Sequence, residues 1–216
     1  MWYKLKKIYQ RSNLVRPRRL PSAYQEVEWI QSSWNQYINT WVTAPTNYLM
    51  TYMKINPQTV STWSQDFRAG WAYNWSRANV HYIGYWQWKF VAGLWWWDYS
   101  TWISISANTL YEITMTANNG SWSVNINGST ASWTYSWTVA LNQPFFLFRN
   151  NESWSAWAGW TFKIYSFQMT TSNWLVRDFV PCYRKSDSVI WMYDLVNKQF
   201  YTNSWSWTFT KWQDVN

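Results

Sequence analysis

Apolar and polar residues alternate in short stretches along most of this chain. Such stretches cover residues 24–30, 37–42, 48–55, 66–73, 79–85, 89–94, 103–106, 110–117, 123–127, 144–149, 161–169, 175–183, 189–194 and 200–203. A period of two is typical of strands that bury one face of a sheet. No segment shows apolar residues at a 3.6-residue period together with helix-capping residues at its ends. The pattern therefore predicts an all-β sandwich built from many short strands.

Turn residues separate several of these strands. Asn118-Asn119-Gly120 is a turn signal, and Asn127-Gly128 is a strong tight-turn dipeptide. The run Trp95 to Asp98 is expected to be a loop. Within residues 161–169, strict alternation predicts two faces: Phe162, Ile164 and Ser166 on one, and Lys163, Tyr165 and Phe167 on the other.

The two ends of the chain carry motifs. Near the start, residues 32–41 read SSWNQYINTW; near the end, 177–187 read RDFVPCYRKSD, 189–194 read VIWMYD and 200–203 read FYTN. These segments resemble LamG-like jelly-roll domains of the concanavalin A-like lectin/glucanase superfamily, which occur in phage tail and fibre proteins and in bacterial surface proteins. The resemblance implies a concanavalin A-like jelly-roll β-sandwich of two antiparallel sheets over residues 21–216. It also implies an aromatic residue at Trp29, which we expect in the core.

Tryptophan stands where those relatives have glycine, at Trp34, Trp41, Trp191, Trp205 and Trp207. The chain has 24 Trp and 6 Gly, whereas average usage predicts about 15 glycines. Half of the tryptophans directly follow Ser, Thr or Asn, the usual neighbours of turn glycines. One interpretation is an aromatic-rich adhesive surface.

The other interpretation, which we favour, is that many of these tryptophans are UGA codons that the source organism or virus reads as glycine under an alternative genetic code. A bulky residue in a positive-φ turn costs about 1–3 kcal/mol, and many such sites would consume the stability of a domain. The indoles of Trp205 and Trp207 are then expected to point outward at loops.

Charge divides the chain into two parts. The net charge is +8, and residues 1–20 hold seven basic residues and no acid: Lys4, Lys6, Lys7, Arg11, Arg16, Arg18 and Arg19. We interpret residues 1–20 as a basic N-terminal arm and linker that docks the domain to a larger protein assembly. No nucleic-acid motif accompanies the charge. No apolar segment is long enough to span a membrane, and no Sec signal peptide is recognisable.

Candidate catalytic groups are sparse. His81 is the single histidine, so Ser-His-acid and zinc arrangements lack parts. Paired carboxylates for glycoside hydrolysis are missing except for Glu26 and Glu28, which sit at the domain edge. We therefore expect no enzyme activity. Cys182 is alone in an apolar run and is expected to be a buried hydrophobe.

Metal binding has weak support. LamG-like domains sometimes bind calcium at loop ends, and the residues that could contribute are Asp98, Asn118, Asn119 and Asp187. No dense acidic loop exists, so no cofactor is expected. Asp187 and Asp194 are expected to orient turns or to pair with Arg184 and Lys185.

Sugar binding combines an aromatic face with polar hydrogen-bonding groups. The candidate ligand-binding residues lie near the central loops: Tyr73, Tyr82, Tyr85, Asp98 and Tyr99. Packing within the sandwich is the alternative role for these tyrosines, and the favoured one.

The resemblance implies a non-catalytic, carbohydrate-binding adhesion module, either virion-associated or extracellular at a cell surface. Its partners would be a glycan or another surface, and it could form homo-oligomers. One alternative is a purely structural virion component without a ligand; another is a glycoside hydrolase of the same superfamily. Fold alone does not decide between these functions.

Overall fold

The computed structural model describes residues 20–33, 36–43, 48–60, 68–71, 82–86, 88–94, 97–135, 144–152, 155–159, 161–172, 174–203 and 208–215. These residues form strands, turns and loops, with no helix among them. Every strand pairing in this part of the chain is antiparallel. Residues 1–19 of the basic arm (residues 1–20) lie outside the described residues.

The larger layer is an 11-stranded sheet with the order β11-β10-β9-β4-β15-β16-β17-β18. Its strands are β4 (Tyr48–Pro57), β9 (Tyr111–Asn118), β10 (Ser121–Ile126), β11 (Ser129–Thr134), β15 (Phe162–Thr171), β16 (Trp174–Arg184), β17 (Ile190–Asp194) and β18 (Gln199–Tyr201). Three short strands complete it: β1 (Tyr24–Glu26) pairs with β16, β2 (Ile30–Gln31) pairs with β15, and β19 (Thr210–Lys211) pairs with β2. The first and last segments of the domain therefore join the same sheet.

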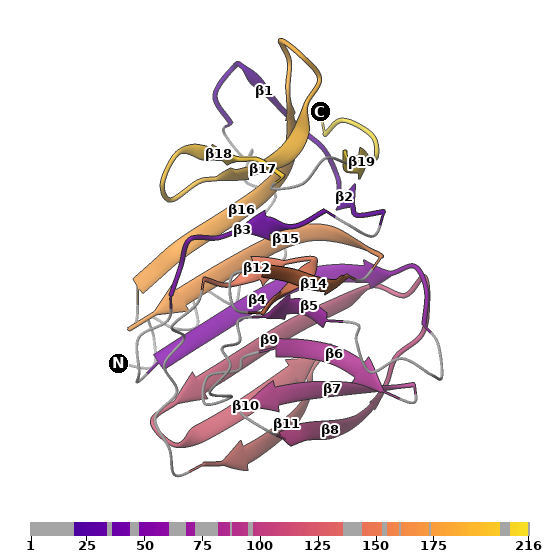
Figure 1. The fold of residues 1–216 in the computed structure, drawn as a ribbon, viewed down its shortest axis with the longest axis vertical. Helices are drawn as coiled ribbons and strands as arrows, with labels where there is room; N and C mark the ends of the chain where they lie inside the picture. The colour runs from indigo at the N-terminus through magenta and orange to yellow at the C-terminus, as the bar shows by residue number, and fades with distance from the viewer. Residues whose placement is uncertain are drawn as a thin grey trace.

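The second layer is a six-stranded sheet with the order β3-β12-β5-β6-β7-β8. Its strands are β3 (Ile38–Asn39), β5 (Arg68–Trp71), β6 (Tyr82–Trp86), β7 (Lys89–Leu94), β8 (Trp97–Ser104) and β12 (Phe146–Leu147). A separate pair contains β13 (Arg149–Glu152) and β14 (Ser155–Gly159). Figure 1 shows this layer lying over the larger sheet, with β17, β18, β1 and β19 gathered at one end.

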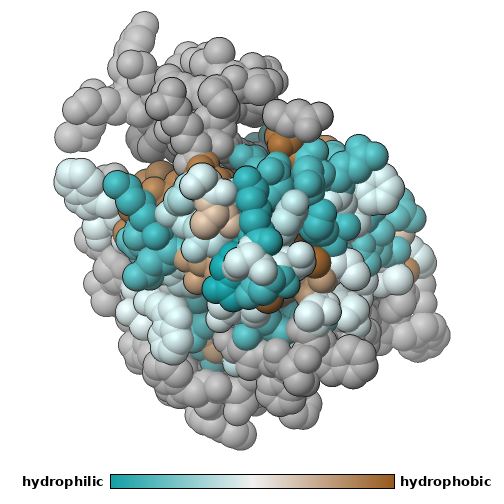
Figure 2. Space-filling view, turned by 90° about the horizontal axis from the view of Figure 1, so that it is seen from above, coloured by the Kyte–Doolittle hydropathy of each residue, from teal (hydrophilic) through white to brown (hydrophobic). Residues whose placement is uncertain are grey.

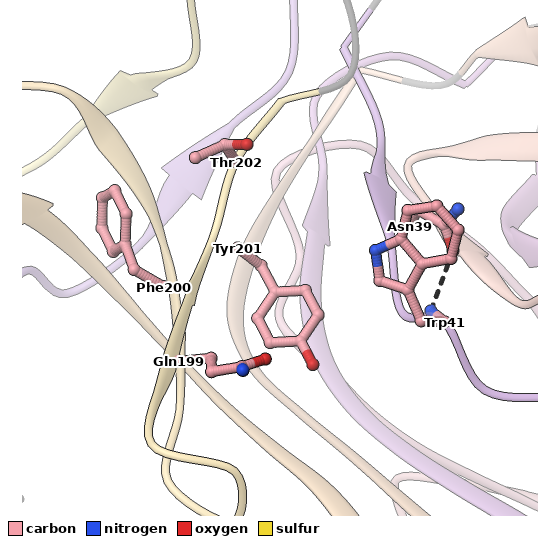
Figure 3. Close-up of a pocket in the computed structure, with 6 residues that line it drawn as sticks. All are labelled: Asn39, Trp41, Gln199, Phe200, Tyr201 and Thr202. Atoms are coloured by element: carbon pink, nitrogen blue, oxygen red, sulfur yellow. Dashed lines mark hydrogen bonds between the residues drawn. The ribbon is translucent and has the colours of Figure 1, made fainter.

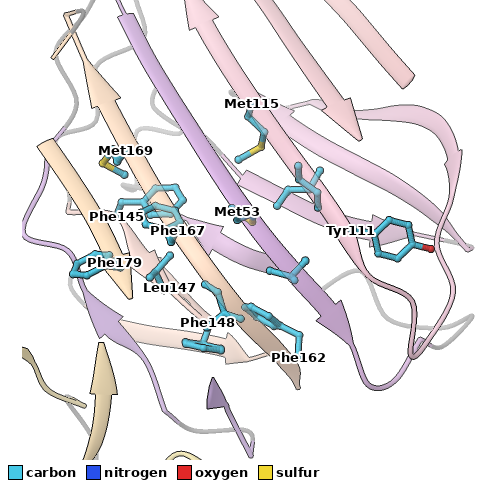
Figure 4. Close-up of a cluster of buried hydrophobic side chains, with 14 of the residues drawn as sticks. Met53, Tyr111, Met115, Phe145, Leu147, Phe148, Phe162, Phe167, Met169 and Phe179 are labelled. Atoms are coloured by element: carbon cyan, nitrogen blue, oxygen red, sulfur yellow. The ribbon is translucent and has the colours of Figure 1, made fainter. Parts of the chain in front are cut away.

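The core lies between the two layers and is rich in aromatic side chains (Figure 4). Phe145 stacks on Phe167 with ring centroids 5.7 Å apart, and Phe148 stacks on Phe162 at 4.6 Å. All four side chains are fully buried. Burial of a side chain of this size contributes about 1.5–3 kcal/mol, so these four rings help to hold the two layers together.

Most predicted strands are present, with boundaries displaced by a few residues. The predicted turns also form: Asn119-Gly120 joins β9 to β10, and Asn127-Gly128 joins β10 to β11. Strand β11 was not predicted. The expected loop over residues 95–98 is wrong at its end, because β8 begins at Trp97 and pairs with β7.

The predicted faces of β15 are correct only up to Tyr165. Phe167 was assigned to the same face as Lys163, yet Phe167 is fully buried in the core, next to the buried Ser166. The register between β15 and β4 shifts between Ile164 and Ser166. A bulge of this kind adds a residue to one strand and reverses the alternation beyond it, so Phe167 turns inward.

Trp29 is buried, as predicted, with 8% of its surface exposed. Its ring stacks on Trp212 at 5.7 Å, and the Lys163 ammonium lies 4.3 Å from the ring centroid. Among the described residues, no helix is long and apolar enough to cross a membrane.

Candidate functional site

A cavity of about 290 Å³ opens between the end of β3 and β18. Its lining residues come from both ends of the domain: Asn39, Trp41, Gln199, Phe200, Tyr201 and Thr202. Two hydrogen bonds tie these ends together nearby. The Tyr37 backbone N–H donates to Asn203 Oδ1 at 3.2 Å, and Gln36 Nε2 donates to the Thr208 carbonyl oxygen at 2.9 Å. The cavity is therefore a product of tertiary structure.

Strand alternation on β18 decides which side chains face the cavity (Figure 3). Gln199 and Tyr201 point toward the gap between β18 and Trp41, whereas Phe200 points the other way. There the Phe200 ring stacks on Tyr24 at 4.9 Å. Gln199 and Thr202 are exposed, so an amide and a hydroxyl are accessible at the rim.

The other wall contains Asn39 and Trp41. Asn39 Oδ1 accepts a hydrogen bond from the Trp41 backbone N–H at 2.8 Å, which closes a tight turn directly after β3. Trp41 is 67% exposed and has the most exposed ring of the six lining residues. Its φ of 55° lies in the left-handed region.

Behind the cavity, Arg177 holds the walls in place. Its Nε donates to the Thr40 carbonyl oxygen at 2.8 Å, and its guanidinium lies over the Tyr201 ring, 5.5 Å from the centroid. The other side of Tyr201 meets Phe179 edge-on at 4.8 Å. Arg177 Nε also lies 3.7 Å from a carboxylate oxygen of the fully buried Asp194. Arg177 and Tyr201 are thus each fixed by several contacts, whereas Gln199 and Thr202 are exposed at the rim.

The chemistry of this lining suits hydrogen bonding to a polar ligand. Amide groups of Asn39 and Gln199 can donate and accept, as can the Thr202 hydroxyl. The volume is at the lower limit of small-molecule sites. Such groups recognise hydroxyl-rich ligands, and none of the six side chains is a carboxylate able to move a proton in glycosidic cleavage.

A second hollow of about 480 Å³ lies on β10 and β11, lined by Ser121, Ser132, Trp133 and Thr134. The Trp133 ring packs against the buried Trp122, with centroids 4.9 Å apart. Strands β10 and β11 lie at the opposite end of the large sheet from β18. This hollow can therefore serve as a control site for experiments on the first cavity.

The residues predicted from sequence to bind a ligand do not line the first cavity. Tyr85 is fully buried in the core, which matches the packing alternative and leaves no ring face for a sugar. Tyr82 belongs to β6, and Asp98 and Tyr99 belong to β8, where they pair with Gly93 and Ala92. Tyr73 lies outside the described residues.

The two acids near the closing strands orient turns, as expected. Asp187 forms an ion pair with Arg184 and accepts a hydrogen bond from the Val189 N–H at 3.2 Å. The hydrogen bond from Arg184 holds the pKa of the Asp187 carboxyl below its usual value. Asp194 accepts from the backbone N–H groups of Asp178 and Val196, both at 3.0 Å.

The ion partner of Asp194 is Arg177, a pair that the sequence did not reveal. Within the described part of the chain, no three His, Cys, Asp or Glu side chains come together as metal ligands. His81 lies outside that part.

The cavity residues come from two segments far apart in the sequence, and Gln199 lies outside every motif that the sequence offers. Asn39 belongs to the opening motif and Tyr201 to the FYTN motif, and both motifs had been noted for the resemblance alone. Their spatial meeting depends on the pairing of β18 with β17 and of β3 with β12. No local sequence pattern predicts that these two distant segments lie side by side.

The fold is shared with solved structures of low sequence identity. A candidate carbohydrate-binding protein from Bacteroides ovatus aligns with a TM-score of 0.60 and 11% identity, covering 88% of this chain and 62% of that one. A heptameric SAP-like pentraxin from Limulus polyphemus aligns with a TM-score of 0.50 and 10% identity, covering 68% and 74%. Domains LG4-5 of the mouse laminin alpha1 chain align with a TM-score of 0.48 and 8% identity, covering 85% of this chain and 50% of that one.

No protein-family model matches the sequence, and no curated protein matches it. The chain spans about 62% of the length of the Bacteroides ovatus protein. Its fold is nonetheless clear from the first two structures and from its own sheets: it is an all-β, jelly-roll β-sandwich. The predicted fold class is confirmed.

Proposed function

We propose that this jelly-roll domain is a non-catalytic attachment module that binds a glycan in the cavity between β3 and β18. The observation that carries the proposal is the grouping of Asn39, Gln199 and Thr202 around a cavity of about 290 Å³. Amides and hydroxyls matched to sugar hydroxyls are the usual means of carbohydrate recognition. The carbohydrate-binding description of the Bacteroides ovatus structure supports the same class of ligand.

We further propose that the module acts at the surface of a virion or of a cell, as part of a larger assembly. The basic arm, residues 1–20, would dock the module, and the sandwich would present the cavity to the target surface. The similarity of the end motifs to phage tail, fibre and bacterial surface proteins supports this setting. Purified virions or cell-surface fractions that lack the chain by peptide mass analysis would exclude it.

Glycan-array binding followed by calorimetry tests the ligand. Wild-type protein should bind a defined glycan subset, and Gln199→Ala or Thr202→Ala should each weaken binding about two- to tenfold, since a lost hydrogen bond costs about 0.5–1.5 kcal/mol. The matched control is Ser132→Ala in the second hollow, which should leave affinity unchanged.

The other outcomes separate the alternatives. Folded protein that binds nothing on a broad array would favour a purely structural role. Equal loss of binding in Ser132→Ala and Gln199→Ala would place the ligand elsewhere. Release of reducing sugars, abolished by changing a single acid, would establish a glycoside hydrolase and overturn the proposal.

A further inference from the structure

Three tryptophans have backbone conformations that favour glycine. Trp41, Trp88 and Trp102 have φ angles of 55°, 63° and 60°. In this region the Cβ of an L-residue crowds the following carbonyl, so bulky residues rarely adopt it. We propose that these three positions are glycine in the natural protein, encoded by a codon that its source reads as glycine. This inference is independent of the proposed function.

The local structure at Trp88 requires a left-handed residue. Strands β6 and β7 are joined by the two residues 87 and 88, because Trp86 pairs with Lys89. The favoured two-residue hairpin turns have a positive φ at one or both central positions, and a type I′ turn, with positive φ at both, strongly prefers glycine at the second. Trp88 occupies that position and is 46% exposed.

Trp102 lies in a bulge of β8. The partners of β7 step from Ser104, opposite Lys89, to Ser100, opposite Val91, so β8 has extra residues there. Trp102 is the middle one, and its N–H donates to Ser100 Oγ at 3.3 Å. Bulges with a left-handed residue are normally built on glycine. The Trp102 side chain is 81% exposed, so burial does not offset the strain.

Trp41 lies between two paired residues. The Thr40 N–H donates to the Phe145 carbonyl oxygen and the Phe145 N–H donates to the Val42 carbonyl oxygen, at 3.0 and 3.1 Å. Trp41 is left outside this pairing, and its indole is 67% exposed. Glycine there would also widen the cavity, so the glycan-binding experiment should use both the Trp41 protein and Trp41→Gly.

Among the described residues, seven other non-glycine residues also have a positive φ, including the exposed Ser188 and Lys198, so a positive φ alone does not mark a glycine position. Asn108, Asn119 and Asn127 belong to a residue type that tolerates the left-handed region. Phe148 has a φ of 72°, but its ring is fully buried against Phe162 and Phe209. Its packing gives a reason for the strain, whereas the indoles of Trp88 and Trp102 are exposed.

The inference does not extend to every tryptophan. Trp29 and Trp122 are buried. Trp191, although predicted from sequence to be a glycine position, packs edge-on against Phe200 and Phe209 and has no positive φ. Trp205 and Trp207, whose indoles were expected to point outward, lie outside the described residues.

The nucleotide sequence of the gene tests directly whether the three positions are glycine in the natural protein. We expect UGA at Trp41, Trp88 and Trp102, and UGG at Trp29. Peptides from the natural source should be lighter at each of the three positions by the mass of an indolylmethyl group less one hydrogen. UGG codons at the three positions, or peptides with tryptophan mass there, would overturn the inference.

Stability of the recombinant chain gives an independent test. At Trp41, Trp88 and Trp102, replacement by glycine should give a folding equilibrium constant about ten times larger than replacement by alanine. The reason is that alanine, unlike glycine, is strained in the left-handed backbone conformation. The matched control is Trp174, which is 77% exposed in β16 without a positive φ. There alanine should equal or exceed glycine. Alanine variants as stable as glycine variants at all three positions would contradict the inference.

Discussion

Arg177 on the closing strand β16 donates from Nε to the backbone carbonyl oxygen of Thr40, 2.8 Å away in the loop after β3. The bond joins residues that are 137 positions apart in the sequence and ties the larger sheet to the segment that carries Asn39 and Trp41. The same guanidinium lies 3.7 Å from the carboxylate of Asp194, which has no exposed surface. Arg177 therefore links the stability of the fold to the shape of the cavity.

Replacement of Arg177 by alanine should lower the free energy of unfolding by about 3 kcal/mol, because Asp194 would be left as a buried charge without its cation. Urea denaturation measures the change. Lys54→Ala is the matched control: its pair with Glu112, at 3.1 Å, is partly solvated on both sides and should contribute less than about 1 kcal/mol. Equal losses for the two variants would contradict the special role of Arg177.

The Phe179 ring supports the cavity from the core. It is fully buried, stacks on Phe167 at 6.0 Å and meets Tyr201 at 4.8 Å. Phe179→Ala should lower the free energy of unfolding by about 3–5 kcal/mol, because it leaves a packing void in the core. It should also weaken glycan binding in any fraction of the protein that remains folded. Leu110→Ala, at a position 41% exposed, should change stability by less than about 0.5 kcal/mol. Thermal unfolding and calorimetry provide the two readouts.

Two genuine glycines calibrate the cost of a side chain in the left-handed region. Gly128, with a φ of 89°, has open space around an added Cβ, whereas a Cβ on Gly120, with a φ of 86°, would lie 2.9 Å from the Tyr135 carbonyl oxygen. Gly128→Ala should cost about 1 kcal/mol from backbone strain alone. Gly120→Ala should cost more, because a backbone atom must also move. Chemical denaturation of both variants measures these two losses of stability. A larger loss for Gly128→Ala than for Gly120→Ala would contradict the prediction.

Burial raises the pKa of the Cys182 thiol from its ordinary value of 9.0 to about 12. At about pH 8, native protein should react far more slowly with an alkylating reagent than urea-unfolded protein, since the thiolate is the nucleophile. Rapid labelling of native protein would show that the β16–β17 region opens readily.

The same shift predicts a pH dependence of stability. Between pH 9 and pH 12 the folded state keeps the Cys182 proton that the unfolded state loses, so the free energy of unfolding falls as the pH rises through this window. Below pH 9 this contribution is fully present. Tyr183 and Tyr193 also have a raised pKa, so the measurement is the difference between wild type and Cys182→Ala, which should lack this part of the alkaline loss.

The sequence by itself determined the class of fold. Period-two alternation is a local property, because successive side chains of a strand point to opposite faces, and it located strands such as β4 and β7 closely. Turn chemistry is equally local: the Asn127-Gly128 dipeptide was recognised because few other residues accept its backbone angles. The identity of Trp29 as a core residue followed from the resemblance and was confirmed by its burial.

Only the tertiary structure decided where the candidate site lies. Gln199 and Asn39 are 160 residues apart, and their meeting depends on how two sheets stack, which no single strand encodes. The bulge that turns Phe167 inward and the partnership of Arg177 with Asp194 have the same origin. Burial and long-range pairing are set by competition among all strands for one core, whereas alternation and turns are set by the geometry of a few consecutive residues.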